Sequence, residues 1–273
     1  MDDAAWRMIP EDRRAPAEAR LLEHLGAAKA FLFVTGKNVD DPHGAALLDR
    51  WASAGHRLGN HTYSHRPMFS KTPVEEFEQD VLRNDALLGA KPGFRKWFRF
   101  PALKEGATPE IRDRLRAFLA SKGYRNGSVT IDASDWYYDQ RLRDRLKADP
   151  RFDVTRYRQP YLDHIWDRAR YYDALSRDVL GRAIPHTLLV HYNLLNSLFL
   201  GDVLAMFRRN GWSVVDAEQA FADPVFERQP KTAPAGESLI WALARETGKF
   251  ESRLRYPGED DVYEKPGLDR LGL

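Results

Sequence analysis

Residues 58–65 read Leu58-Gly59-Asn60-His61-Thr62-Tyr63-Ser64-His65 and place two imidazoles four residues apart, just past a short predicted strand. Imidazole is the commonest protein ligand for zinc and related ions, so this segment can supply two ligands of a small metal site. The Gly-Asn start and the Thr and Ser residues favour a loop or a first helical turn. Two solvated histidines on a polar loop are the alternative when the segment is taken alone.

Composition limits the class of protein. The chain has 273 residues, of which 43% are hydrophobic and 30% charged, and this suits one large α/β domain. Its 42 basic and 40 acidic residues give a formal net charge of +2, so we expect neither nucleic acid nor an anionic membrane as a partner. The absence of cysteine leaves His, Asp and Glu as metal ligands. No apolar run approaches the roughly 20 residues of a membrane span, and the oligomeric state stays open.

Strand-like and helix-like segments alternate along most of the chain. Apolar runs typical of strands occupy residues 30–35, 56–60, 97–101, 124–131, 186–191 and 212–215. Helices are predicted at residues 15–26, 44–54, 72–88, 108–121, 161–181, 197–209 and 216–222. This alternation predicts a parallel sheet or a (β/α) barrel. The proline-rich segment 223–273 is interpreted as an extended tail with one helix near residues 237–246.

In such folds the chemistry takes place at the carboxyl ends of the strands. Polar side chains that follow a predicted strand are therefore the site candidates: His61, His65, Arg99, Asp132, Asp135 and His191. The other five histidines fall on helices, in linkers or at strand starts, and we interpret them as structural or solvated: His24, His43, His56, His164 and His186.

Four ordered motifs resemble those of the NodB-type polysaccharide deacetylases, carbohydrate esterase family 4 (CE4), which act on chitin and peptidoglycan. Residues 61–65 match His-Ser/Thr-x-x-His, residues 99–101 match Arg-x-Pro, residues 132–136 match Asp-x-x-Asp-Trp, and residues 188–191 match Leu-x-Ile/Val-His. After the Arg-x-Pro match, Ala102 and Leu103 replace the family's usual aromatic residue and glycine. The resemblance implies an α/β fold, a distorted (β/α) barrel of the glycoside hydrolase/deacetylase type. It assigns residues 1–222 to a catalytic domain and residues 223–273 to a C-terminal extension packed on that domain or extending from it.

The family's first motif, Thr-Phe-Asp-Asp-Gly, is represented only by Met1-Asp2-Asp3-Ala4. By position, the resemblance makes Asp2 the catalytic base and Asp3 the metal-binding carboxylate; an exposed acidic segment is the alternative. The strand that precedes this motif in the family is missing, so we expect the natural reading frame to begin upstream of Met1. A signal peptide in that upstream segment would make the protein periplasmic or extracellular, and without one it would be cytoplasmic.

The resemblance implies a role for the other motif residues. Asp3, His61 and His65 would hold a divalent transition metal, with zinc as the favoured ion. Asp2 would take a proton from the attacking water, and Arg99 would orient Asp2.

The leaving amine would receive its proton from His191, whose imidazole Asp135 would hold. The metal and the N–H of Ala102 would stabilise the oxyanion. Side chains that would contact the substrate are Trp136, Leu188, Pro101 and Ala102.

We expect a metal-dependent hydrolase that removes acetyl groups from an N-acetylated sugar in a chitin-like or peptidoglycan-like glycan. The alternative is a catalytically impaired, carbohydrate-binding relative that keeps the fold. A third hypothesis is a hydrolase of a small amide or ester with the same site.

Overall fold

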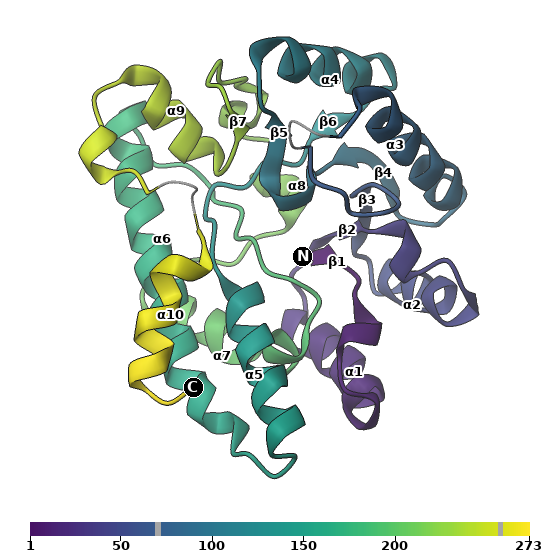
Figure 1. Cartoon of the computed structure of the whole chain (residues 1–273), viewed down its shortest axis with the longest axis vertical. Helices are drawn as coiled ribbons and strands as arrows, with labels where there is room; N and C mark the ends of the chain where they lie inside the picture. Colours follow the sequence, from purple (N-terminus) through teal and green to yellow (C-terminus); the bar gives the residue numbers. More distant parts are fainter. Residues whose placement is uncertain (69–71, 256–258) are drawn as a thin grey trace.

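Within the described part of the chain, five short segments form a parallel sheet (Figure 1). In a computed structural model that describes residues 1–68, 72–255 and 259–273, the strands of this sheet follow the order β1-β2-β3-β4-β6. They are β1 (Asp2–Asp3), β2 (Phe31–Val34), β3 (Arg57–Asn60), β4 (Phe94–Phe98) and β6 (Arg125–Asn126). All four β2 side chains are buried, because a parallel strand in the middle of the sheet is covered on both faces.

The segment 187–192 contacts β1 on one side and, on the other, the chain that follows β6. Isolated bridges pair Asp2 with His191 and Ile131 with Leu188. The N–H of Asp2 donates to Val190 O at 3.0 Å, and the N–H of Leu189 donates to Ile131 O at 3.0 Å. The predicted α/β fold with a parallel sheet is confirmed, but the barrel is not closed among the described residues, because only isolated bridges extend the sheet beyond β1 and β6. The strands predicted at 124–131 and 186–191 are shorter and more irregular than expected.

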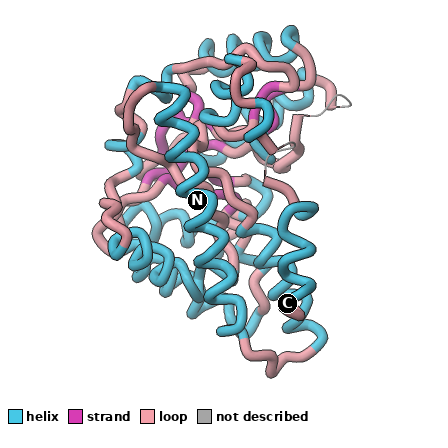
Figure 2. Tube along the Cα trace, turned by 90° about the vertical axis from the view of Figure 1, so that its left-hand side faces the viewer, coloured by secondary structure: helices cyan, strands magenta, loops and turns pink. Residues whose placement is uncertain are grey.

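Helices surround the strands, as the view turned by 90° shows (Figure 2). Local sequence explains several of their starts: Asp41 caps one helix by accepting the N–H of Gly44 at 2.7 Å, and Pro42 follows it at the first helical position. The helices are α1 (Arg14–Leu25), α2 (Pro42–Ser53), α3 (Val74–Leu88), α4 (Pro109–Ser121), α5 (Asp135–Ala148), α6 (Arg158–Leu180), α7 (Leu194–Arg209), α8 (Ala217–Ala220), α9 (Leu239–Thr247) and α10 (Asp261–Arg270).

Three sequence predictions need correction. Helix α5 was missed because its sequence is rich in charge and has a weak apolar stripe. Helix α10 was missed because Pro266 lies inside it. Residues 212–215 were predicted as a strand, but they pair with no strand in the part of the chain that the structure describes. Trp212 instead stacks near Phe207, with ring centroids 5.4 Å apart, so its apolar character serves side-chain packing.

The described residues after position 222 contribute to the same hydrophobic core as the rest of the chain. Strand β7 (Ala235–Gly236) pairs with β5 (Lys104–Gly106) in a small antiparallel sheet. The apolar residues of α9, together with Leu268 and Leu273, are buried in the main hydrophobic cluster. Of the described helices, none has the length and apolar character needed to cross a membrane.

Close packing of β2 against β3 generates a first prediction. A Cβ added at Gly59 would lie 2.6 Å from the ring of Phe33 and 3.1 Å from Trp97 O. We predict that Gly59→Ala lowers the free energy of unfolding by about 1–3 kcal/mol, because the core must shift to admit the methyl group.

Urea unfolding measures the effect, with Gly267→Ala as the matched control. A Cβ at Gly267, in α10, meets no atom within 4 Å, so that variant should be neutral or more stable by up to about 1 kcal/mol. Equal unfolding free energies for Gly59→Ala and the unsubstituted chain would contradict the packing argument.

Candidate metal and catalytic site

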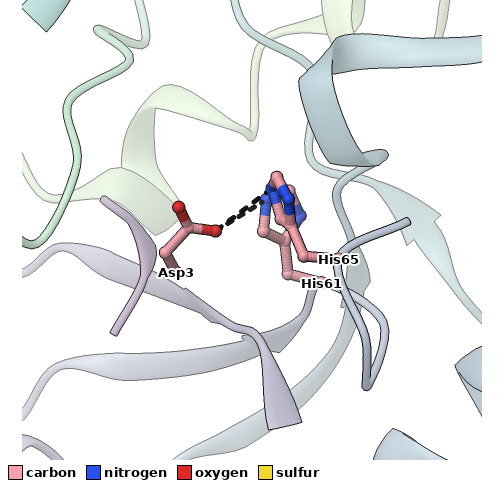
Figure 3. A group of neighbouring side chains, drawn as sticks. All are labelled: Asp3, His61 and His65. Atoms are coloured by element: carbon pink, nitrogen blue, oxygen red, sulfur yellow. Dashed lines mark ion pairs between the residues drawn. The ribbon is translucent and has the colours of Figure 1, made fainter. Parts of the chain in front are cut away.

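Three potential metal ligands meet where β1 and β3 end. Asp3 is the last residue of β1, and His61 and His65 follow β3, with both rings facing the Asp3 carboxylate (Figure 3). Asp3 Oδ1 lies 3.2 Å from His65 Nε2 and 3.6 Å from His61 Nε2, and the three ligand atoms are all within 4.8 Å of one another. Ligand atoms that share one tetrahedral zinc-type ion lie roughly 3.3–3.6 Å apart. Small adjustments of these side chains would therefore allow one ion to be held.

A backbone carbonyl fixes the orientation of His61. Its Nδ1 lies 2.7 Å from Arg99 O, and because a carbonyl only accepts, Nδ1 carries the proton. The lone pair of Nε2 then faces Asp3, as in metal sites whose histidines donate their other N–H to a neighbour. Burial lowers the pKa of His61 to about 4, so at neutral pH the ring is uncharged and able to bind a metal.

The histidine segment is a loop with left-handed turns. Thr62 and His65 have φ of 62° and 56°, a region that residues other than glycine seldom adopt. Asn60 Oδ1 accepts the N–H of Thr62 at 2.9 Å, and Thr62 Oγ1 accepts the N–H of His65 at 3.0 Å. These hydrogen bonds curl the backbone so that both rings lie on one side of the loop.

Asp2 lies beside the triad as a buried carboxylate. Its Oδ1 accepts from Arg99 Nη1 at 2.7 Å, and its Oδ2 lies 3.8 Å from His61 Nε2. Burial would raise the pKa of Asp2, but Arg99 and then His61 lower it below its ordinary value. With an exposure of 2%, Asp2 is not part of an exposed acidic segment, and it stays ionised.

A second charged pair consists of the partly buried His191 and the fully buried Asp135. His191 Nδ1 donates to Asp135 Oδ1 at 2.7 Å. Burial would lower the pKa of His191, but the Asp135 carboxylate outweighs it and raises the pKa to about 10. His191 is therefore protonated at neutral pH. Its backbone forms the bridge to Asp2, which brings this pair to the same end of the sheet as the triad.

Two asparagines that the sequence reasoning missed support Asp135. Asp135 Oδ2 accepts from Asn196 Nδ2 at 2.7 Å, from Asn193 Nδ2 at 3.1 Å and from the N–H of His191 at 2.8 Å. Asn193 also caps α7 by accepting the N–H of Asn196. The only sequence signal for Asn193 was its position two residues after His191. Asn196 lies within α7, and the sequence gave no signal for its role.

Four further residues were predicted to contact the substrate: Pro101, Ala102, Trp136 and Leu188. Pro101 is buried and opens a short turn in which Ala102 is exposed, with φ of 50°. Trp136 is 37% exposed, and Leu188 lines a cavity together with Arg99. Their contact with substrate stays a prediction.

Asp132, the remaining strand-end candidate, is buried, and its Oδ1 accepts the N–H of Ala133 at 2.9 Å. Its pKa is raised well above the ordinary value by burial and by Glu259 and Glu237. We assign it no part in the site.

The fold and this arrangement of Asp, His and Arg side chains indicate a CE4-type deacetylase domain. Residues 4–127 match the family model described as polysaccharide deacetylase, and this part of the chain belongs to that family.

Individual relatives are more distant. A segment of 109 residues is 27% identical to the peptidoglycan-N-acetylglucosamine deacetylase of Bacillus cereus and covers 40% of this chain. It spans 36% of the length of that relative.

Two solved structures show the same fold. One, described as a deacetylase with substrate, has a TM-score of 0.52 at 23% identity and covers 81% of this chain and 88% of its own. A CE4 family pseudoenzyme from Bacillus anthracis has a TM-score of 0.52 at 18% identity and covers 75% of this chain and 60% of its own. Membership of the family therefore does not decide whether a chain is active.

The triad generates a second prediction. We predict that the protein binds one divalent transition metal ion per chain and that His61→Ala or His65→Ala weakens this binding by more than about 100-fold. Loss of a ligand should exceed the roughly 10–100-fold effect of losing a group that only orients one.

Titration calorimetry with Zn²⁺ and Co²⁺ measures the affinity, and elemental analysis measures the bound ion. His43→Ala is the control, because His43 is exposed and stacks on Trp6. Equal metal content in the His61→Ala, His43→Ala and unsubstituted proteins would refute the site.

Proposed function

We propose that this chain is a metal-dependent hydrolase that removes acetyl groups from N-acetylated sugars in a glycan such as peptidoglycan or chitin. The strongest support for this proposal is that three side chains of one site, Asp2, His61 and His191, have the protonation states that amide hydrolysis requires. Asp2 is held ionised by Arg99, His61 is neutral, and His191 is protonated. Hydrolysis of an amide needs these three states together: a base, a metal ligand and an acid.

Asp3, His61 and His65 would hold the metal. Their oxygen and nitrogen donors suit a zinc-type ion, and three protein ligands leave a coordination position open, as in catalytic zinc sites. When bound, such an ion polarises a carbonyl and lowers the pKa of water to roughly 7. Zinc is the ion that we favour, because two of the three donors are imidazoles.

The protein's own groups would carry the protons. Asp2 takes a proton from the water that attacks the acetyl carbon, and Arg99 fixes the carboxylate during this transfer. As the bond between carbonyl carbon and nitrogen breaks, His191 gives the proton on its Nε2 to the leaving amine. The products are acetate and a free amino sugar. Asp135 and its two asparagine partners keep the imidazole oriented throughout.

Substrate contacts follow from the motif positions. The N–H of Ala102 is the backbone donor that we assign to the oxyanion, and Pro101 holds the turn on which Ala102 lies. Trp136 and Leu188 would enclose the acetyl methyl group, and the partly exposed Trp136 ring could also pack against a sugar face. The Bacillus cereus relative, named for peptidoglycan N-acetylglucosamine, supports a glycan as the substrate.

A second candidate function is a carbohydrate-binding relative without activity. Two observations favour it: a structure of similar fold is described as a pseudoenzyme, and Ala4 replaces the family's glycine at a position with φ of 51°. Residues other than glycine are strained there. Strain at Ala4 could displace its neighbours Asp3 and Asp2.

Acetate release distinguishes the two functions. We predict that the metal-loaded protein releases acetate from an N-acetylglucosamine oligomer and that His191→Ala lowers kcat by about 10²–10⁴-fold, because general acid catalysis contributes that much. The bound metal content should not change in His191→Ala, and His43→Ala should keep full activity. Oligomer binding without acetate release by the unsubstituted protein would favour the binding function instead.

A further inference from the structure

His164 links the end of the chain to the start of α5. It lies on α6, is 7% exposed, and stacks on Tyr138 with ring centroids 5.0 Å apart. Its Nε2 lies 2.9 Å from the backbone nitrogen of Ser134, and its Nδ1 lies 3.3 Å from Glu264 Oε2 on α10. The imidazole of His164 thus contacts the residue before α5 through Nε2 and helix α10 through Nδ1.

These two contacts require a single tautomer. The N–H of Ser134 can only donate, so Nε2 of His164 must be unprotonated and the ring proton must lie on Nδ1. Nδ1–H then donates to Glu264. Burial would raise the pKa of Glu264, but the hydrogen bond from His164 and its charge interactions lower it, so Glu264 is an ionised acceptor.

The contact with Ser134 lies next to the proposed acid. Ser134 precedes Asp135, the first residue of α5, and Asp135 holds His191. Helix α5 has no local side-chain cap, so His164 provides the acceptor that a capping residue would supply elsewhere. The direction in which the helix starts, and with it the position of the Asp135 carboxylate, depends on this ring.

Helix α10 is also fastened further along α5. Arg141 pairs with Asp269 at 2.8 Å, and Arg145 Nη2 donates to Gly272 O at 3.0 Å. Leu268 and Leu273 are buried in the main hydrophobic cluster. In Figure 1, α10 accordingly lies alongside α5 and α6. The chain end therefore contacts α5 directly at Arg141 and Arg145, and it reaches the start of α5 through His164.

We propose that His164 and Glu264 are positioning residues for the His191–Asp135 pair, so that α10 is part of the catalytic architecture. This inference rests on the proposed function, in which His191 is the general acid. The pair touches neither substrate nor metal. It fixes the backbone from which Asp135 reaches His191, and a shift of roughly 1 Å at such a site can cost about 100-fold in rate.

Two substitutions of His164 separate positioning from bulk packing. His164→Leu removes both hydrogen bonds and keeps an apolar side chain, whereas His164→Gln retains an acceptor for Ser134. We expect kcat on an N-acetylglucosamine oligomer to fall about 10-fold in His164→Leu, with KM nearly unchanged, and most of the loss to be restored in His164→Gln.

Substitutions on α10 test the participation of the chain end. Glu264→Leu should lower kcat several-fold, again without a change in KM. Lys265→Gln is the matched control, because Lys265 is exposed on the same helix and forms its ion pair with Asp269, away from His164; the kcat of this variant should not change. Unchanged kcat in a folded His164→Leu protein would overturn the proposal.

NMR provides readouts that need no activity. Nitrogen-15 shifts of His164 in the unsubstituted protein should show the Nδ1–H tautomer, and the Ser134 amide should exchange at least about 10-fold faster in His164→Leu. The Nδ1–H proton of His191, bonded to Asp135, should shift in the same variant. An Nε2–H tautomer of His164 would overturn the proposal even if His164→Leu did not fold. The unsubstituted protein could release no acetate while the His164, Ser134 and His191 signals behave as expected. That result would refute the proposed deacetylase function but not the positioning of His191 by His164.

Discussion

The rest of the site depends on the buried ion pair between Asp2 and Arg99. Removing two charges from water costs several kcal/mol per ion, and the pair is tolerated only if its geometry is good and the other donors are satisfied. Here Arg99 Nη1 contacts Asp2 Oδ1 at 2.7 Å, Nε donates to Gly127 O at 2.7 Å, and the guanidinium lies 4.1 Å from the Phe33 ring centroid. The backbone of Asp2 also bonds to Val190 and Tyr192. One residue therefore ties β1, the exit of β4 and the His191 segment together.

The two site histidines carry different charges because their hydrogen-bond partners differ. His61 donates to a carbonyl and is shielded from water, so its pKa falls to about 4. His191 donates to the Asp135 carboxylate, so its pKa rises to about 10. The arrangement thereby places a neutral imidazole and a charged imidazole at one end of one sheet. In the proposed mechanism, α5 and the chain end matter because they position the Asp135 carboxylate that raises the pKa of His191.

Sequence reasoning found the residues that follow strands, and it missed those that act from helices. The carboxyl ends of parallel strands converge, so His61, Arg99 and His191 could be expected to meet. Asp2 and Asp3 came only from the family resemblance, because two acidic residues near the start of a sequence carry no periodic signal. Asn196 and His164 lie within helices, and their partners are distant in sequence. Only tertiary packing shows which side chain faces Asp135 or Ser134. Helix α5 was missed for another reason: its many charged residues weaken the apolar periodicity from which a helix is predicted.

We propose that His191, charged by Asp135, is the acid of a metal-dependent deacetylation. The most direct test is the pH dependence of kcat/KM for acetate release from an N-acetylglucosamine oligomer, compared between the unsubstituted protein and Asp135→Asn at equal metal content. The acid must be protonated to act, so activity should be lost as pH rises through the pKa of His191. Asp135→Asn removes the charge that raises this pKa, and we predict that the alkaline limb moves to lower pH. An alkaline limb at the same pH in both proteins would show that His191, charged by Asp135, is not the acid.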